Sequence, residues 1–428
     1  MRRSHPFLAA VASLLATVGP LLASATGAAA AAPAAPGGTL HWKSCGGGYQ
    51  CSKLAVPVDY RSPSGATVDI AVARRPARDP EHRTGSLVIN YGGPGDPGTQ
   101  SLELAGTAIP AAVRDRFDLV SFDPRGTGRS KPIDCIDDAT ADRLFAEDPT
   151  PDTPADLARF YAGTNSSVDL VKACVDRFGT WLAEVGTRNV ARDMERLRIA
   201  LGDDELTYLG YSYGTVLGAV YAQMYPHRVR AMVLDSAVDL SSTPEQEELG
   251  NAAGFEHALD AFLADCAARA SCAFHSDGDP RAALTRLRDR FEAGLRLPTA
   301  DGRRAGQAAF YLALVAALYA KQQGWPLLAR GLRNAERGDG TVLQLIADSY
   351  TGRAPNGRYD NVQEAIGPIR CADRRDPKVA FDAYRSTYQQ LSAQFPFLGP
   401  LIAGSPAGCD PRLPQVAPGE ALGDVEVT

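Results

Sequence analysis

The chain has 428 residues, of which 45% are hydrophobic and 22% are charged, and its formal net charge is -6. This balance is typical of a globular protein that is long enough for two lobes or one large decorated core. The sequence has no basic patch or arm, which argues against a nucleic-acid partner.

The first 31 residues have the three-part pattern of a secretory signal peptide. Two arginines precede an apolar stretch from Phe7, and a run of small residues follows it. We expect cleavage between Ala25 and Ala32 and a secreted, extracellular protein with no stable membrane association afterwards. An uncleaved membrane anchor is the alternative, and Pro20 together with the small-residue tail argues against it.

The eight cysteines fit an exported protein, because their number is even and disulfides form in oxidising compartments. No C-x-x-C pair is present and few histidines lie near the cysteines, so zinc is disfavoured and we expect no metal and no cofactor. Spacing does not fix the connectivity, and eight free thiols are the alternative. We expect pairing in sequence order: Cys45 with Cys51, Cys135 with Cys174, Cys266 with Cys272, and Cys371 with Cys409.

Residues 51–77 alternate in polarity between turn residues, which predicts a hairpin or meander of strands. Continuous apolar runs then begin at Gly85, Phe117, Leu206 and Val229, and such runs are typical of buried parallel strands. Segments with helical periodicity lie between them, such as 189–202, where one face is apolar. Strands that alternate with helices predict an α/β fold with a mostly parallel sheet.

The loop 123–130, with the sequence DPRGTGRS, follows the second of these runs. Its aspartate and arginines could contact a substrate. The favoured interpretation is that they hold a tight loop beside the site.

Residues 210–214 read Gly-Tyr-Ser-Tyr-Gly and match the pattern G-x-S-x-G. An apolar strand leads into the pattern and a helical segment leads out of it, which is the context that a nucleophile elbow requires. We therefore predict that Ser212 is a catalytic nucleophile. An ordinary glycine turn is the alternative.

Residues 91–95 read Tyr-Gly-Gly-Pro-Gly and follow the first apolar run. A glycine-rich turn at this place lets a backbone N–H face the reaction centre. We predict that a backbone N–H of this turn and the N–H of Tyr213 form an oxyanion hole, and a plain glycine turn is the alternative.

Residues 241–414 change character and predict a large helical cap with no convincing strand. The apolar run near Leu312 is too short to span a bilayer and fits a buried helix. The expected organisation is a signal peptide at 1–31, a core at 32–240, the cap at 241–414, and a linker at 415–428 toward an absent C-terminal core segment.

The segments NYGGPG, SFDPRGTGRS, LGYSYGT and VLDSAVD, in this order, resemble the secreted α/β-hydrolases called tripeptidyl aminopeptidases, which are relatives of proline iminopeptidase. VPVDY near the front and IRCAD at 369–373 are similar to the family as well. The resemblance spans residues 42–409. It implies an eight-stranded core, a helical cap and a serine triad that releases N-terminal residues or short peptides, with Ser212 as nucleophile and Gly93 and Tyr213 as oxyanion donors.

No histidine is identified as the triad base. In this fold the acid and then the histidine follow the serine along the chain. His5 leaves with the signal peptide, and His41 and His82 precede the core strands that build the site. His227 lies about 20 Å from Ser212, beyond the nucleophile helix. His257 and His275 lie in the cap. Asp239 is a weak candidate for the acid. We expect the closing C-terminal strands, which carry acid and base in the family, to be missing from this sequence.

Two classes of function follow from these patterns. The first is a secreted serine exopeptidase whose activity in this chain is in doubt without a base, with an esterase as the variant that uses the same elbow. The second is a non-catalytic, secreted peptide-binding protein. An aminopeptidase needs carboxylates for the substrate ammonium, and Glu245, Glu247 and Glu248 are candidates, although a solvated acidic helix start is the favoured interpretation. We expect a monomer that acts on a peptide or a small ester.

Overall fold

The computed structural model describes residues 38–374, 378–404, 408–414 and 421–422. The predicted signal peptide and nearly all of the predicted linker at 415–428 lie outside the described residues. Among the residues described, no helix combines the length and apolar character that a membrane span requires.

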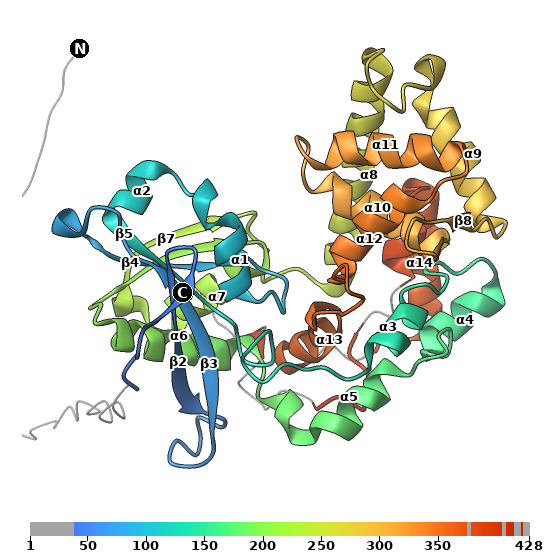
Figure 1. Ribbon diagram of the computed structural model, residues 1–428. Coiled ribbons are helices and arrows are strands. Elements are labelled where there is room, and N and C mark those ends of the chain that lie inside the picture. The colour runs from blue at the N-terminus through green and yellow to red at the C-terminus, as the bar shows by residue number, and fades with distance from the viewer. Residues whose placement is uncertain (1–37, 375–377, 405–407, 415–420, 423–428) are drawn as a thin grey trace, which may run out of the picture. The chain divides into compact units, whose positions relative to one another are not determined.

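Seven strands form one mixed sheet in the order β1-β2-β3-β5-β4-β6-β7 (Figure 1). Strands β1, β2 and β3 form the predicted antiparallel meander, and β3 also runs antiparallel to β5. Strands β4, β5, β6 and β7 run parallel, as their apolar runs predict. The strands are β1 (Lys43–Gly46), β2 (Tyr49–Pro57), β3 (Thr67–Arg75), β4 (Gly85–Asn90), β5 (Phe117–Phe122), β6 (Leu206–Tyr211) and β7 (Val229–Asp235).

The parallel register brings the carboxyl ends of β4, β5, β6 and β7 to one edge of the sheet. In this register Val88 pairs with Tyr208, and Leu209 pairs with Val233. Strands β4 and β5 are buried along nearly their whole length, because helices cover both faces of a parallel sheet. The turns that follow β4 and β6 therefore lie next to each other at the same edge.

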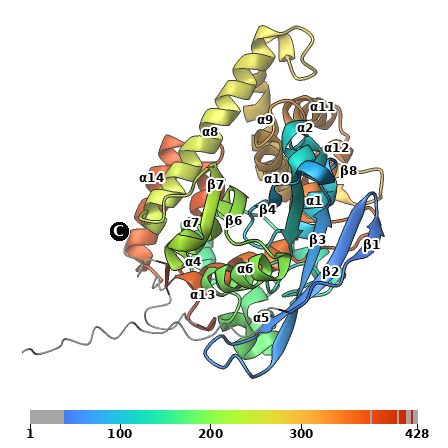
Figure 2. The ribbon, with the colours of Figure 1, turned by 90° about the vertical axis from the view of Figure 1, so that its left-hand side faces the viewer.

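Helices cover both faces of the sheet (Figures 1 and 2). On one face, α6 and α7 pack in a cluster that includes Val88 and Val120. On the other face, α1 and α2 pack in a cluster that includes Ile89 and Leu119. Neighbouring strand residues thus point to opposite faces, as the two-residue period of a strand requires. These helices are α1 (Gly98–Ala105), α2 (Ala111–Arg116), α6 (Thr187–Leu201) and α7 (Tyr213–Met224).

The helices α8 (Pro244–Ala268), α9 (Pro280–Glu292), α10 (Gln307–Leu318), α11 (Gly324–Glu336), α12 (Thr341–Thr351), α14 (Phe381–Gln394) and α15 (Gly399–Ala403) are called the cap here. Most of them share a second hydrophobic cluster, separate from the clusters on the sheet. Helix α10 is the buried apolar helix predicted near Leu312. The expectation of no strand in this region is wrong, because Leu297–Pro298 (β8) and Arg304–Ala305 (β9) pair antiparallel. Two-residue strands are too short to show a period in the sequence.

Four further helices are not predicted by the sequence patterns: α3 (Asp138–Leu144), α4 (Pro154–Ala162), α5 (Leu170–Phe178) and α13 (Val362–Asp373). The segment with α3 to α5 reaches the cap, since the ring of Tyr161 contacts the ring of Tyr384 and Arg353 forms an ion pair with Asp142 at 2.7 Å. Helix α13 instead packs on the sheet cluster, through residues such as Ile369. Short 3-10 turns complete the elements: η1 (Pro80–His82), η2 (Gly106–Ala108), η3 (Gly179–Ala183), η4 (Pro226–Arg228) and η5 (Ser276–Gly278).

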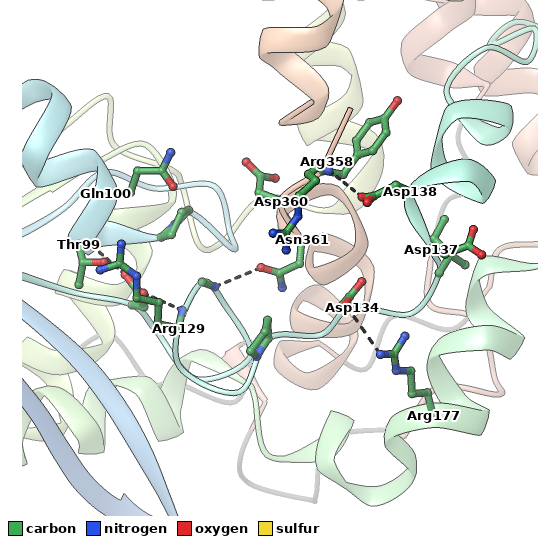
Figure 3. A pocket seen from close by; sticks show the side chains of 16 residues that line it. Thr99, Gln100, Arg129, Asp134, Asp137, Asp138, Arg177, Arg358, Asp360 and Asn361 are labelled. Carbon is green, nitrogen blue, oxygen red and sulfur yellow. Dashed lines mark hydrogen bonds and ion pairs between the residues drawn. The ribbon is translucent and has the colours of Figure 1, made fainter. Parts of the chain in front are cut away.

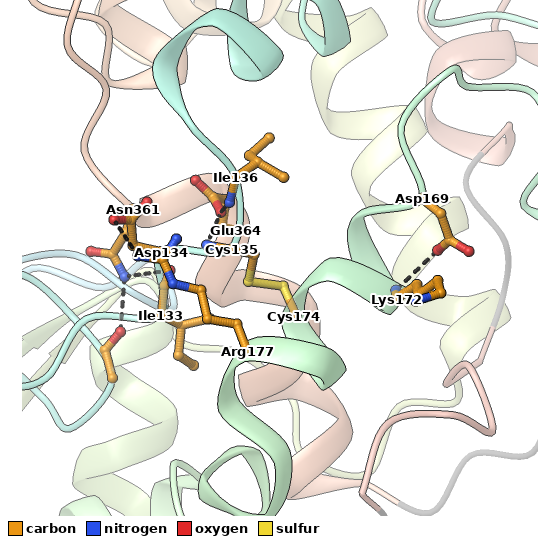
Figure 4. Close-up of a disulfide and its surroundings, with 11 residues drawn as sticks. Ile133, Asp134, Cys135, Ile136, Asp169, Lys172, Cys174, Arg177, Asn361 and Glu364 are labelled. Atoms are coloured by element: carbon orange, nitrogen blue, oxygen red, sulfur yellow. Dashed lines mark hydrogen bonds and ion pairs between the residues drawn. A yellow bond between two sulfur atoms is a disulfide. The ribbon is translucent and has the colours of Figure 1, made fainter.

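Four disulfides join the cysteines in sequence order, which is the pairing expected above: Cys45–Cys51, Cys135–Cys174, Cys266–Cys272 and Cys371–Cys409. Figure 4 shows the Cys135–Cys174 bond, which ties the start of the α3–α5 segment to α5. No described cysteine is free.

Candidate active site

Ser212 lies on a sharp turn between β6 and α7. Its φ is 52° and its ψ is -122°, a conformation that L-residues rarely adopt and that costs on the order of 1–3 kcal/mol. The Ser212 N–H donates to the Asp235 carbonyl at 3.0 Å, so the pairing of β6 with β7 continues up to the turn. The residue is exposed at the edge where the parallel strands end. This is the strand–turn–helix geometry of a nucleophile elbow.

The two glycines of the motif are required by close backbone approach. A Cβ at Gly210 would lie 2.4 Å from the Gly214 carbonyl oxygen, and a Cβ at Gly214 would lie 2.6 Å from the carbonyl oxygen of Asn90. Any side chain at either position would push β6, α7 and β4 apart. The motif therefore reflects packing as well as chemistry.

The glycine turn after β4 packs directly on the elbow. A Cβ at Gly92 would lie 2.7 Å from the Tyr211 carbonyl oxygen, 3.0 Å from the Ser212 Cβ and 3.2 Å from the Tyr213 nitrogen. The Asn90 side chain accepts the Gly92 N–H at 3.0 Å and fixes the turn. Tyr213 is the first residue of α7, and N–H groups in the first turn of a helix have no partner within the helix. The turn that carries Gly93 therefore lies against Ser212 and Tyr213, and the role of Gly93 and Tyr213 as oxyanion donors stays a prediction.

The loop 123–130 is held by its own buried charges. The carboxylate of Asp123 accepts the N–H groups of Thr99 and Arg129, both at 2.8 Å. The Arg125 guanidinium is fully buried and forms an ion pair with Asp193 at 2.6 Å. The favoured interpretation of this loop, as a pinned turn beside the site, agrees with these contacts.

A cavity of about 500 Å³ opens at the start of α1, beside this loop (Figure 3). Five aspartates and three arginines are among its lining residues, so a ligand with charged ends would be better accommodated than an apolar one. Thr99 and Gln100 line it from α1, Asp123 and Arg129 from the loop, and Asp360 and Asn361 from the segment that precedes α13.

Asp96 adds a carboxyl group between the oxyanion turn and α1. Its side chain accepts the Ser101 hydroxyl at 2.7 Å. Burial, with smaller contributions from the negative charges of Asp123 and Asp360, raises the pKa of Asp96 to about 6. Sequence patterns gave no signal for this residue, because an aspartate after a glycine turn is common in loops.

The three glutamates at the start of α8 have different surroundings. Glu247 forms ion pairs with Arg370 at 3.0 Å and Arg374 at 2.6 Å, so its charge is already compensated. Burial, and then the neighbouring Glu245, raise the pKa of Glu248 to about 7. Glu248 is therefore the one of the three whose charge a cationic ligand would stabilise most.

Asp239, the weak candidate for the triad acid, lies in the turn after β7 and is exposed. Its Oδ1 accepts the N–H of Ser241 at 2.8 Å and the hydroxyl of Ser241 at 2.7 Å, and these bonds lower the pKa of Asp239. The carboxylate is therefore ionised at neutral pH, and the two hydrogen bonds from Ser241 already occupy its Oδ1.

The five described histidines lie away from the elbow. His82 and His227 belong to the turns η1 and η4, which precede β4 and β7 and so lie at the opposite edge of the sheet from Ser212. His41 precedes β1, the strand at the far side of the sheet, which β2, β3, β5 and β4 separate from β6 and Ser212. His257 is exposed on α8, as expected, and the His275 ring contacts the Cys266 carbonyl at 3.0 Å within the cap.

In the described part of the chain, one group of three residues has possible metal-ligand atoms close together: Cys45, Cys51 and Glu103. The two sulfur atoms of this group are joined in a disulfide, so they are not available as thiolate ligands.

The strand order, the elbow and the glycine turn together define an α/β-hydrolase. Residues 85–292 match the family model described as alpha/beta hydrolase fold, in agreement with this geometry. Serine protease Hip1 of Mycobacterium tuberculosis is 41% identical over 343 residues, which are 77% of this chain and 64% of that protein. Carboxylesterase B of the same organism is 35% identical over 359 residues, or 82% of this chain and 66% of that protein. Tripeptidyl aminopeptidase of Streptomyces coelicolor is 38% identical over 232 residues, or 51% of this chain and 41% of that protein. The chain thus spans somewhat less than two thirds of the length of the Hip1 protein.

Proposed function

We propose that the protein is a secreted serine hydrolase of the exopeptidase type, which releases N-terminal residues or short peptides through an acyl-enzyme on Ser212. The observation that carries the proposal is the exposed serine on a strained elbow, with the Gly92–Gly93 turn packed against it. The relatives named serine protease and tripeptidyl aminopeptidase support the peptidase class. The four disulfides support export, because they persist in oxidising compartments.

The reaction proceeds in two steps. The Ser212 Oγ bonds to the carbonyl carbon while its proton goes to a base, and the carbonyl oxygen becomes an oxyanion that the N–H groups of Gly93 and Tyr213 stabilise. The C–N bond then breaks, and the amine leaves with a proton returned by the base. Water cleaves the resulting ester by the same route in reverse and frees the serine.

The acid and base of this reaction are proposed to come from a segment that pairs with β7. The outer edge of β7 has no partner strand among the described residues. Val233 and Leu234 on this strand are 59% and 36% exposed, which is unusual for a parallel strand. A parallel strand added there would cover these side chains, and its carboxyl end would lie at the same edge as Ser212. This agrees with the place that the family resemblance gives to the triad acid and histidine.

Two carboxyl groups with raised pKa values support the preference for a free N-terminus. Burial is the main reason why the pKa values of Glu248 on α8 and Asp96 beside the oxyanion turn are raised, and a nearby cation would stabilise either carboxylate. A substrate ammonium would supply that charge. We expect Glu248→Gln to weaken binding of peptides with a free N-terminus. Glu245→Gln, at the exposed neighbour, should have little effect on this binding.

Two alternatives each have one observation in their favour. A non-catalytic peptide-binding protein is favoured by the placement of the five described histidines away from Ser212. An esterase is favoured by the relative named carboxylesterase B.

A substrate panel separates the three. Tripeptidyl amides with a free N-terminus, the same amides with an acetylated N-terminus, and short-chain nitrophenyl esters are compared on the native protein and on Ser212→Ala. Preferential hydrolysis of the free tripeptidyl amides, lost in the variant, is expected. Faster ester cleavage with no peptide cleavage would support the esterase, and peptide binding without a serine-dependent reaction would support the binding protein.

Export is tested by recovering the protein from culture medium, where its N-terminus should lie between Ala25 and Ala32. We expect a monomer on size-exclusion chromatography.

A further inference from the structure

Asp373 is the last residue of α13, and its side chain lies where three helices meet. It is 2% exposed. Its Oδ2 accepts the hydroxyl of Tyr213, at the start of α7, and the hydroxyl of Thr187, at the start of α6, the latter at 2.7 Å. Its Oδ1 accepts the Thr187 N–H at 2.5 Å. The hydroxyls of Thr187 and Tyr213 are themselves 3.1 Å apart. One carboxylate therefore joins the ends of three helices.

Tyr213 is the residue whose backbone N–H is predicted to serve the oxyanion hole. Its ring is fixed at both ends, because the backbone is held by the Ser212 turn and the hydroxyl is held by Asp373 and Thr187. A tyrosine has two side-chain torsions, so fixing the hydroxyl restricts how the peptide group of Tyr213 can rotate. Oxyanion stabilisation depends on donors that are already oriented before the reaction.

The local charges favour an ionised carboxylate at neutral pH. Burial raises the pKa of Asp373 to about 6, while the bonds from Tyr213 and Thr187 oppose this effect. Arg374, the next residue along the chain, also lowers the pKa of Asp373. The Thr187 N–H belongs to the first turn of α6, where the helix dipole favours a negative charge. An ionised acceptor can take all three bonds at once, whereas a protonated one gives up part of this capacity.

We propose that Asp373 is a positioning residue that orients the oxyanion-hole N–H of Tyr213 through the tyrosine hydroxyl. This inference rests on the proposed function, in which Ser212 is acylated. It adds a residue on α13, more than 150 positions away from the elbow in sequence, to the groups that set the rate of acylation.

The test measures covalent modification of Ser212 by a fluorophosphonate over a range of reagent concentrations. The serine Oγ bonds to phosphorus, the P–F bond breaks, fluoride leaves and the serine proton goes to the solvent. For Asp373→Asn we expect the maximal rate constant to fall about 10-fold, since a misoriented donor loses part of the 10²–10³-fold effect of a deleted one. The half-saturating concentration should stay unchanged. Tyr213→Phe should behave alike, and the double variant should be no slower than the slower single variant.

Glu364→Gln is the matched control. Glu364 is a buried carboxyl group on the same helix, and its Oε2 accepts the N–H groups of Cys135 and Ile136, in the segment that precedes α3 (Figure 4). This variant should keep the native labelling rate. Equal rates for the native protein and Asp373→Asn, or equal slowing in Asp373→Asn and Glu364→Gln, would overturn the proposal.

Hydrogen exchange separates this inference from the proposed function. Peptide-resolved exchange should be faster around Tyr213 in Asp373→Asn and unchanged there in Glu364→Gln. If the native protein is not labelled at all, the proposed function fails, and exchange alone decides about Asp373. Unchanged exchange around Tyr213 in Asp373→Asn overturns the positioning role in either case.

Discussion

Replacement of Gly92 by alanine tests whether the glycine turn and the elbow form one unit. The residue has a φ of +108°, and an alanine Cβ would lie 2.7 Å from the Tyr211 carbonyl oxygen and 3.0 Å from the Ser212 Cβ. The backbone strain should cost about 1–3 kcal/mol. Displacement of the turn should add about 1–3 kcal/mol, the usual penalty for overpacking. Labelling of Ser212 by a fluorophosphonate should slow by about 10²-fold if the oxyanion donor on the turn moves away.

Gly48→Ala supplies the control for this prediction. Gly48 has a φ of +80° and a Cβ there would meet nothing within 4 Å, so only the backbone strain applies. The assay is urea unfolding of both variants with disulfides intact, together with the labelling rate. Gly92→Ala should lose more stability than Gly48→Ala, and it alone should label slowly. Native labelling in Gly92→Ala would refute the packed arrangement of turn and elbow.

Three further predictions concern buried charge, a disulfide and pH. Arg125→Met should lower the free energy of unfolding by about 3–5 kcal/mol, because it leaves a buried carboxylate without its partner, and urea unfolding measures this; a loss below about 1 kcal/mol would contradict it. Replacing both Cys135 and Cys174 by alanine should cost about 4 kcal/mol from the chain entropy of a 39-residue loop, measured in the same way; an unchanged urea midpoint would argue against this. Burial raises the pKa of Glu364 to about 7, above its ordinary value of 4.5, so its stabilising contribution is present below pH 4.5 and is lost as pH rises toward 7. Unfolding measured between pH 4.5 and 7 should therefore show a weaker pH dependence in Glu364→Gln, and an identical slope would refute this.

The sequence predicts the sheet and the elbow well, because both depend on local patterns. Strands β4 and β5 are buried on both faces and so appear as unbroken apolar runs. The Gly210–Gly214 motif is set by close backbone contacts and by the strand and helix on either side of it. The disulfides also follow the expected pairing in sequence order.

The parts that the sequence does not predict depend on distant contacts. Helix α13 contains Pro368 and packs on the sheet cluster, so neither its composition nor its place in the chain separates it from the cap segments. Asp373 meets Thr187 and Tyr213 only after α6, α7 and α13 have packed. A buried carboxylate of this kind has no periodic or motif signal, and only the folded structure reveals its partners.

The most direct test of the account is to map the fluorophosphonate adduct by mass spectrometry of peptides from the native protein. We expect a single adduct on the peptide that contains Ser212. It should form slowly, because no described histidine lies beside the serine, and it should be absent from Ser212→Ala. An unmodified Ser212 peptide after prolonged exposure, or equal modification of Ser212→Ala, would contradict the assignment of this residue as the nucleophile.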